Sequence, residues 1–249
     1  MRAIGAFLLG AALCLGCVCR GVAAAELEPG DIVVIAYDST RAEDHFAWAS
    51  LRGIPSNTLI SFTDSSVSNG LFRWTEHLGQ LPAGPLTWSD TNDLAAGTVV
   101  RFVSNFWSRG TALGAAMNFS TDGDQIFIYT GRITNNPSLP TPWRGDASGA
   151  TMIFGITFAN GGWNNSTGGS TTDSFIPPGL SSNNHTAVYT DSFDNGFYRG
   201  ILTGTVSRLR KAIATRANWV TGNSSFDPTN WPVMLDVRPD PRGAVIQVR

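Results

Sequence analysis

The residues best suited to chemistry in this chain are aspartates in the loops beside short apolar runs. Carboxylate oxygens in such loops bind Ca²⁺, a hard cation that takes about six or more oxygen ligands in proteins. The chain has no EF-hand pattern, so a calcium site would be assembled from separate loops. In the alternative interpretation, the same carboxylates accept backbone N–H groups and hold turns. The candidate metal ligands are Asp38, Asp44, Asp64, Asp122, Asp124, Asp191 and Asp194.

Two tryptophans in polar loops are candidates for carbohydrate binding. Trp143 lies in a loop rich in proline, and Trp163 lies in one rich in Gly, Asn, Ser and Thr. An exposed indole offers a large flat surface on which a sugar ring can stack, which suits an extracellular glycan-binding module. Because tryptophan also fills β-sandwich cores, a packing role is the alternative for both residues.

Motifs of the common hydrolases are absent from the sequence. There is no G-x-S-x-G, H-E-x-x-H or G-x-x-x-x-G-K pattern. The three histidines, His45, His77 and His185, are scattered, although two of them follow acidic residues. The catalytic alternative is therefore a polysaccharide or ester hydrolase that uses loop carboxylates such as Asp64.

The first 25 residues predict a secretory signal peptide. Arg2 gives a positive start, residues 4–18 are apolar, and Ala23-Ala24-Ala25 offers a small-residue cleavage site. The apolar run is shorter than the roughly 20 residues that span a bilayer, so we expect cleavage, secretion and no membrane association. Cleavage removes all three cysteines, so the mature domain is expected to be stabilised by its core without disulfides.

The charge of the chain narrows the classes of partner. Charged residues make up 14% of the sequence, against about 25% in an average soluble domain. The formal net charge is −2, and loss of Arg2 and Arg20 with the signal peptide makes the mature chain more acidic. This composition gives no basic footprint for nucleic acid or an anionic membrane. The expected partners are an extracellular polysaccharide or a matrix or surface protein.

Short apolar runs between Gly, Asn, Asp, Ser and Pro turns predict a mostly β fold. Residues 32–37 are apolar on both faces, which predicts a central strand that is covered on both sides. The one clear helical pattern starts after Thr205 as N-cap, with Leu209 and Ile213 on its buried face. We expect an antiparallel β-sandwich, immunoglobulin-like or jelly-roll-like, with one late α-helix.

The segments between the strands complete this expected organisation. Residues 104–120 are expected to be an irregular connection and residues 191–196 a loop, and the helix is expected to end at Asn218-Trp219. The expected domains are the signal peptide at 1–25, the β-sandwich at 26–232 and a C-terminal tail at 233–249. The tail has two β-type pieces, 233–237 and 244–248, which form a candidate final strand pair.

Motifs of Gly, Asp, Pro and aromatic residues follow one another in a set order over most of Leu27 to Trp231. They are Gly30–Ile35, Phe46-Ala47-Trp48, Ile54–Asp64, Leu94–Val100, Gly123–Ile126, Pro177–Leu180, Asp194–Gly200 and the helix closed by Asn218-Trp219. In these motifs the chain resembles a widespread uncharacterised domain of secreted bacterial surface and matrix proteins. It is similar, more distantly, to lamin-tail-type immunoglobulin-like sandwiches. The resemblance implies an extracellular β-sandwich and supplies no catalytic residues.

We therefore expect a secreted extracellular binding or structural module without catalytic activity. The alternatives are a glycan-binding module that uses Trp143 or Trp163, and a hydrolase that uses the loop carboxylates. The loop from Asp38 to Asp44 is where a bound ion or partner is expected first.

Overall fold

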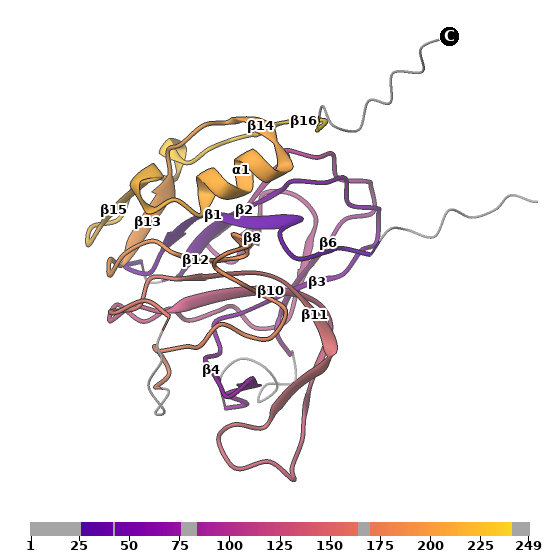
Figure 1. The fold of residues 1–249 in the computed structure, drawn as a ribbon, viewed down its shortest axis with the longest axis vertical. Coiled ribbons are helices and arrows are strands. Elements are labelled where there is room, and N and C mark those ends of the chain that lie inside the picture. Colours follow the sequence, from indigo (N-terminus) through magenta and orange to yellow (C-terminus); the bar gives the residue numbers. More distant parts are fainter. Residues whose placement is uncertain (1–25, 42, 76–83, 164–169, 241–249) are drawn as a thin grey trace, which may run out of the picture.

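A computed structural model of the chain describes residues 26–41, 43–75, 84–163 and 170–240, and it contains two packed β-sheets (Figure 1). The first sheet has, in spatial order, the strands β15 (Trp219–Gly222), β13 (Asn195–Tyr198), β1 (Ile32–Asp38), β2 (His45–Ser50), β7 (Val99–Val103) and β8 (Phe106–Trp107). The second has β4 (Val67–Ser68), β5 (Leu71–Phe72), β11 (Gly145–Thr157), β10 (Gln125–Asn135), β3 (Ile60–Thr63), β6 (Leu86–Ser89) and β9 (Thr111–Leu113), and β12 (Ala187–Tyr189) pairs with β11. The mostly β fold with sandwich-like antiparallel sheets and one late helix is confirmed.

Strand β1 lies at the centre of the molecule. All of its residues are buried, because the second sheet packs on one face and the helix α1 (Val206–Ile213) lies on the other (Figure 1). Leu209 and Ile213 of α1 are fully buried and belong to the same hydrophobic core as β1. The expectation of a central strand covered on both sides is confirmed.

The helix begins as expected and ends earlier than expected. The Thr205 side chain accepts a hydrogen bond from the backbone N–H of Arg208, which is the N-cap geometry. The helix ends at Ile213 and is followed by the 3₁₀ turn η1 (Arg216–Asn218). Asn218 and Trp219 fold back on the helix, where the Trp219 indole donates to the Ile213 carbonyl at 2.7 Å. The expected helix end at Asn218-Trp219 is therefore wrong, because these side chains cap the helix from outside it.

Two segments that were expected to be irregular form strands. Residues 104–120 contain β8 and β9, which lie at the edges of opposite sheets, so this segment crosses from one sheet to the other. Gly110 permits the turn between them, with φ +81° and no room for a Cβ beside Trp88. The expected loop at 191–196 ends in β13, whose polar first residue, Asn195, is fully buried beside β1.

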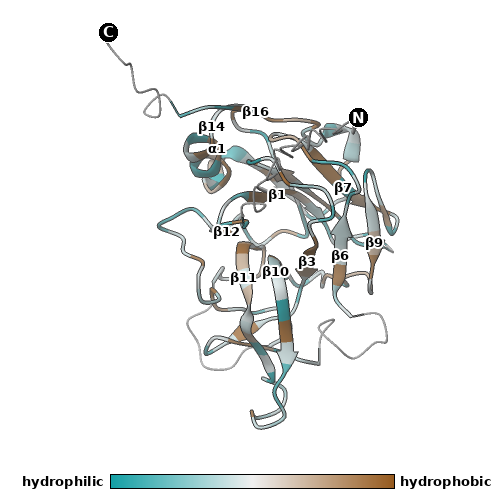
Figure 2. Ribbon diagram, turned by 90° about the vertical axis from the view of Figure 1, so that its right-hand side faces the viewer, coloured by the Kyte–Doolittle hydropathy of each residue, from teal (hydrophilic) through white to brown (hydrophobic). Residues whose placement is uncertain are grey.

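The strands β10 and β11 extend beyond the sandwich as a two-stranded hairpin (Figure 2). A second hydrophobic cluster packs on the face of the second sheet that is turned away from the main core. It includes Phe72, Phe127 and Tyr129. Loops from residues 65–75 and 175–187 pack over it, so this sheet is also covered on both faces.

The C-terminal part of the described chain joins the domain. Strand β16 (Asp236–Arg238) pairs in parallel with β14 (Thr203–Thr205), just before α1, and Leu235 is buried in the main core. The expected signal peptide and the β-type piece at 244–248 lie outside the described residues. Among the described residues, no helix has the length and apolar character that a membrane span requires.

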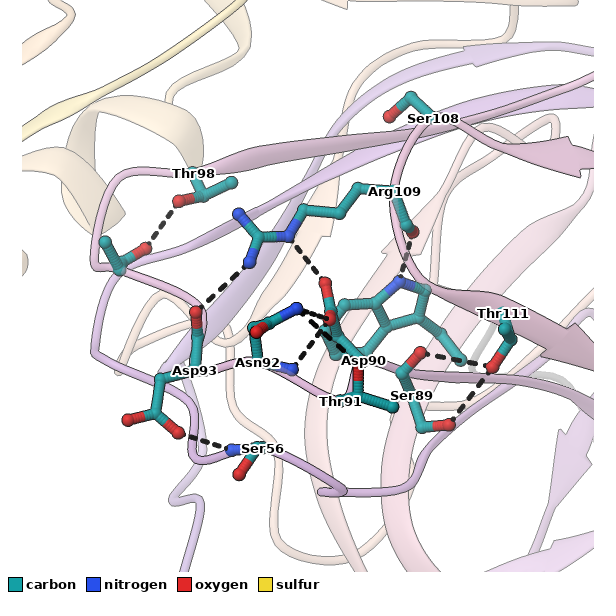
Figure 3. A network of polar contacts seen from close by, with 12 residues as sticks. Ser56, Ser89, Asp90, Thr91, Asn92, Asp93, Thr98, Ser108, Arg109 and Thr111 are labelled. Carbon is teal, nitrogen blue, oxygen red and sulfur yellow. Dashed lines mark hydrogen bonds and ion pairs between the residues drawn. The ribbon is translucent and has the colours of Figure 1, made fainter.

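A network of polar contacts joins the loops after β6 (Figure 3). Arg109 forms an ion pair with Asp90 at 2.6 Å and donates to the Asp93 carbonyl at 3.2 Å. The Arg109 carbonyl in turn accepts from the buried Trp88 indole at 2.7 Å. The side-chain hydrogen bond from Arg109, followed by the backbone N–H of Asn92, lowers the pKa of Asp90 below its usual value. This network lies at the end of the sandwich where β3 begins.

The Asp90–Arg109 pair should make stability depend on pH in the acid range. A carboxyl group whose pKa is lower in the folded than in the unfolded chain stabilises the fold above the unfolded pKa, about 3.9 for Asp, and this stabilisation is lost as the pH falls through the folded pKa. Urea unfolding of Asp90→Asn should therefore show a deficit against the wild type at pH 7 that shrinks at pH 3. Arg109→Met should reproduce the deficit, and the double variant should be no worse than either single one. Additive deficits would show that the pair is not the cause.

Candidate functional site

All seven candidate aspartates lie at one end of the sandwich, which we call the acidic end. Here β1, β3, β11 and β12 end, while β2, β10 and β13 begin. Pairing fixes this arrangement: Asp38 of β1 lies opposite both His45 of β2 and Asn195 of β13, and Gln125 of β10 lies opposite Thr157 of β11. Antiparallel order therefore gathers loops that are far apart in the sequence.

Three of the carboxylates hold one short backbone segment. Asp64 accepts from the N–H of Asn118 at 2.8 Å, Asp124 accepts from the N–H of Ser120 at 2.9 Å, and Asp44 accepts from the intervening N–H of Phe119. Three successive amides are thus bound by three acidic side chains from different strand ends. Charge-assisted hydrogen bonds of this kind are about twice as strong as neutral ones, so the segment is held firmly against the ends of both sheets.

The buried side-chain amide of Gln125 supports this arrangement from the interior of the protein. Gln125 is fully buried, and its Nε2 donates to Asp124 Oδ1 at 2.7 Å, to the Thr171 carbonyl at 3.1 Å and to the Asp64 carbonyl. The backbone N–H of Gln125 also donates to Asp124 Oδ1, at 2.8 Å. Asp124 therefore binds both Gln125, the first residue of β10, and Ser120 of the preceding loop.

Two adjoining pockets open on either side of this loop, and Thr121 lines both, so we treat them as one acidic cleft. The first has a volume of about 440 Å³ and is lined by Asp64 and Asp124 among others. The second has a volume of about 300 Å³. Its polar lining comes from four loops and includes Asp122, Asn160, Ser192, Asp194 and Asn223.

Asp122 and Asp194 interact electrostatically across the second pocket. Burial raises the pKa of Asp194 above its usual value, and the negative charge of Asp122 raises it further. Phe193, which is half-buried, adds an aromatic side chain to the lining. The cleft therefore combines carboxylate and amide groups with apolar ring surface, and one carboxyl group there favours its protonated form more than a solvated aspartate does.

The two remaining candidates are engaged in ion pairs. Asp38 is fully buried, forms an ion pair with Arg41 at 2.9 Å and accepts from the backbone N–H of Thr40 at 3.1 Å. Asp191 pairs with Arg216. In both cases the carboxylate fixes the start of a loop, so the structural interpretation of these two aspartates has direct support. From the loop between Asp38 and Asp44, Asp44 accepts the backbone N–H of Phe119, a residue that lines the cleft.

The described residues contain no group of three or more His, Cys, Asp or Glu side chains placed to hold a metal ion. Calcium binding by the seven aspartates stays a prediction, and the cleft is interpreted below without a metal.

Neither candidate tryptophan lines the acidic cleft. Trp143 is half-buried in the loop that joins β10 and β11, with the Arg73 guanidinium 5.8 Å from its ring centroid. Trp163 is also half-buried and stacks on Phe127 at 5.8 Å, where it packs against the second hydrophobic cluster. These contacts support the packing alternative for Trp163, and the cation–π contact of Trp143 occupies part of its ring.

The described histidines do not enter the cleft lining. His45 is the first residue of β2 and is almost fully buried, and its pKa is lowered by burial and then by the nearby Arg41. His185 lies in a turn with φ +59° before β12. His77 lies outside the described residues.

The chain matches no protein-family model, and neither a curated protein nor a solved structure is similar to it. The site is therefore interpreted from its own geometry. Sequence analysis singled out Asp122 and Asp194 and missed their neighbours Asn160, Phe193 and Asn223. These residues stand in ordinary turn-rich segments, and only the sheet topology brings them together.

Proposed function

We propose that this protein is a secreted, non-catalytic binding module that takes a polyhydroxylated ligand, such as an extracellular polysaccharide chain, in the acidic cleft. The observation that carries the proposal is the pair of adjoining pockets around Thr121, which are lined by carboxylate and amide groups from several loops. The resemblance to domains of secreted surface and matrix proteins agrees with an extracellular ligand of this kind.

The chemistry of the lining favours hydroxyl groups. Carboxylates accept hydrogen bonds and cannot donate them when ionised, whereas amides do both. Asp122 and Asp194 supply acceptors, Asn160 and Asn223 supply both functions, and Phe193 offers an apolar ring. A sugar presents hydroxyl donors around an apolar ring face and so matches this combination. Pockets with a few converging polar groups on a rigid scaffold are typical ligand sites.

A hydrolase that acts on the same ligand is the second candidate, and the Asp122–Asp194 pair is the observation that favours it. Glycoside hydrolysis uses a carboxylic acid with a raised pKa, which protonates the leaving oxygen, and a carboxylate that activates the attacking water. Asp194 has the raised pKa and would be the acid, with Asp122 as the base.

One set of measurements tests both candidates. The purified mature chain should bind at least one member of a glycan array, and Asn160→Ala and Asp194→Asn should each weaken that binding about tenfold, the loss expected when a charged or buried hydrogen bond is removed. Asn183→Ala, an exposed asparagine that does not line the cleft, is the matched control. Binding that persists in EDTA would show that calcium is not the bridge.

The outcomes separate the alternatives. Release of reducing ends from the bound glycan, lost in both Asp194→Asn and Asp122→Asn, would replace the binding proposal with the hydrolase. Binding that is unchanged in the cleft variants and lost in Trp143→Ala would move the site to the β10–β11 hairpin. Absence of binding across neutral and acidic glycans would overturn the proposal.

A further inference from the structure

A second concave surface lies at the other end of β13 from the acidic cleft. It is a groove of about 690 Å³. One side consists of residues from 197–202, at and just after the end of β13, and the other consists of residues 229–233, at and just after the 3₁₀ turn η2 (Pro228–Asn230). This volume falls in the range of roughly 300–1,000 Å³ that is typical of small-molecule sites.

The walls of the groove are fixed by contacts that do not involve a ligand. On one side, the buried Tyr198 donates from its hydroxyl to the Ile201 carbonyl at 2.8 Å, which closes the turn at Gly200 against the tyrosine ring. On the other side, Arg101 donates to the carbonyl of the buried Trp231 at 3.1 Å. A backbone hydrogen bond from Asp236 to Leu202 at 2.8 Å joins the two sides. The groove is therefore preformed.

The rim of the groove is apolar and exposed. Leu202 is 44% exposed and Val233 is 74% exposed, and both line the groove, while Met234 beside them is 63% exposed. With Ile201, these side chains account for four of the seven large apolar residues that are exposed among the described residues. Exposed apolar side chains at the rim of a groove favour an interaction site.

One positive charge stands in this apolar surface. Arg199 lines the groove and is exposed, and within the described ranges its guanidinium has neither an ion pair nor a hydrogen bond. The residues that line the groove include no acidic side chain. The Asp236 carboxylate, which lies close in sequence to the rim, is paired with Arg238 at 3.0 Å. The groove therefore offers an unpaired cation beside apolar walls.

We infer that the groove binds a small amphipathic carboxylate, with its apolar chain between Leu202 and Val233 and its carboxylate on Arg199. The occupant follows from the charge and the walls: the guanidinium fork matches a carboxylate, and the apolar surface matches an aliphatic or aromatic body. This site is separate from the acidic cleft and does not depend on the function proposed for it.

Calorimetric titration with octanoate, octanol and octylammonium tests the assignment. Octanoate should bind the wild-type mature chain, octanol should bind more weakly, and octylammonium should not bind. Arg199→Gln should weaken octanoate binding about tenfold, as expected for the loss of a charged hydrogen bond, and leave octanol unchanged. Val233→Asp should remove octanoate binding. Arg208→Gln, an exposed arginine on α1, should change nothing.

Circular dichroism establishes that each variant is folded before it is titrated. Octanoate binding that is equal in the wild type and Arg199→Gln would overturn the inference, as would octylammonium binding as tight as that of octanoate. No octanoate binding by the folded wild type would overturn it as well. Failure here leaves the acidic cleft untouched, because glycan binding is measured on different variants.

Discussion

Replacement of Gly123 by alanine is expected to destabilise the protein by about 3 kcal/mol and to abolish ligand binding in the acidic cleft. Gly123 has φ +97°, a left-handed conformation that costs an alanine about 1–2 kcal/mol. An added Cβ would also lie 2.5 Å from the Ala159 Cα and 2.8 Å from the Phe158 carbonyl oxygen. The backbone of residue 123 or that of residues 158–159 must then move, and this overpacking adds about 1–3 kcal/mol to the loss.

Gly161 supplies the matched control for this substitution. Its φ of +88° is nearly the same, but an added Cβ would meet no atom within 4 Å. Gly161→Ala should therefore cost only about 1–2 kcal/mol, from backbone strain. Urea unfolding measures both values. Equal losses in the two variants would show that close packing of the 121–124 loop against Phe158 and Ala159 is not what holds the cleft.

The second large effect is expected at Asp124, and Asp124→Ala should destabilise the fold by about 3 kcal/mol. The substitution removes an almost fully buried carboxylate and leaves the N–H groups of Ser120 and Gln125 without their acceptor. Hydrogen bonds to charged groups contribute about 1.5–3 kcal/mol each, with incomplete additivity because neighbouring groups can find other partners.

Asp122→Ala, two residues away, is the control. Asp122 is exposed, so its removal should change the free energy of unfolding by no more than about 0.5 kcal/mol. It should also lower the pKa of Asp194, because the repelling charge is gone; NMR titration of the Asp194 carboxyl carbon reads this shift. A loss of stability in Asp122→Ala as large as that in Asp124→Ala would contradict the distinction between the structural and the ligand-facing carboxylates.

Local sequence patterns predicted those elements whose burial follows from their own composition. Residues 32–37 are apolar on both faces and form the covered strand β1, and Thr205 is the N-cap that its side chain suggests. Strand β13 was missed because Asn195 and Gly196 look like turn residues, yet pairing with β1 and β15 buries them. Tertiary contacts override local propensity in such segments.

The same division applies to the site. The sequence identifies the acidic residues but not which of them face a cavity. Asp38 is held by the backbone and side chains around it. Asp124 lines the first pocket, but its carboxylate accepts from the Ser120 backbone. Asp122 and Asp194 line the second pocket. This difference depends on where separate strand ends meet, which no spacing along the chain encodes. The groove at Arg199 was missed for the same reason, because its walls are about 30 residues apart in sequence.

The crossing segment that carries β8 and β9 has a consequence for behaviour at high concentration. Exposed sheet edges present unpaired N–H and C=O groups on which another chain can add a strand, and short edges limit this. The edge strands β8 and β9 have only two and three residues. The edge strands on the other side of each sheet, β4 and β15, have two and four residues. These four short edges therefore offer little template for edge-to-edge aggregation, and the solubility of the protein should depend on keeping β8 and β9 short.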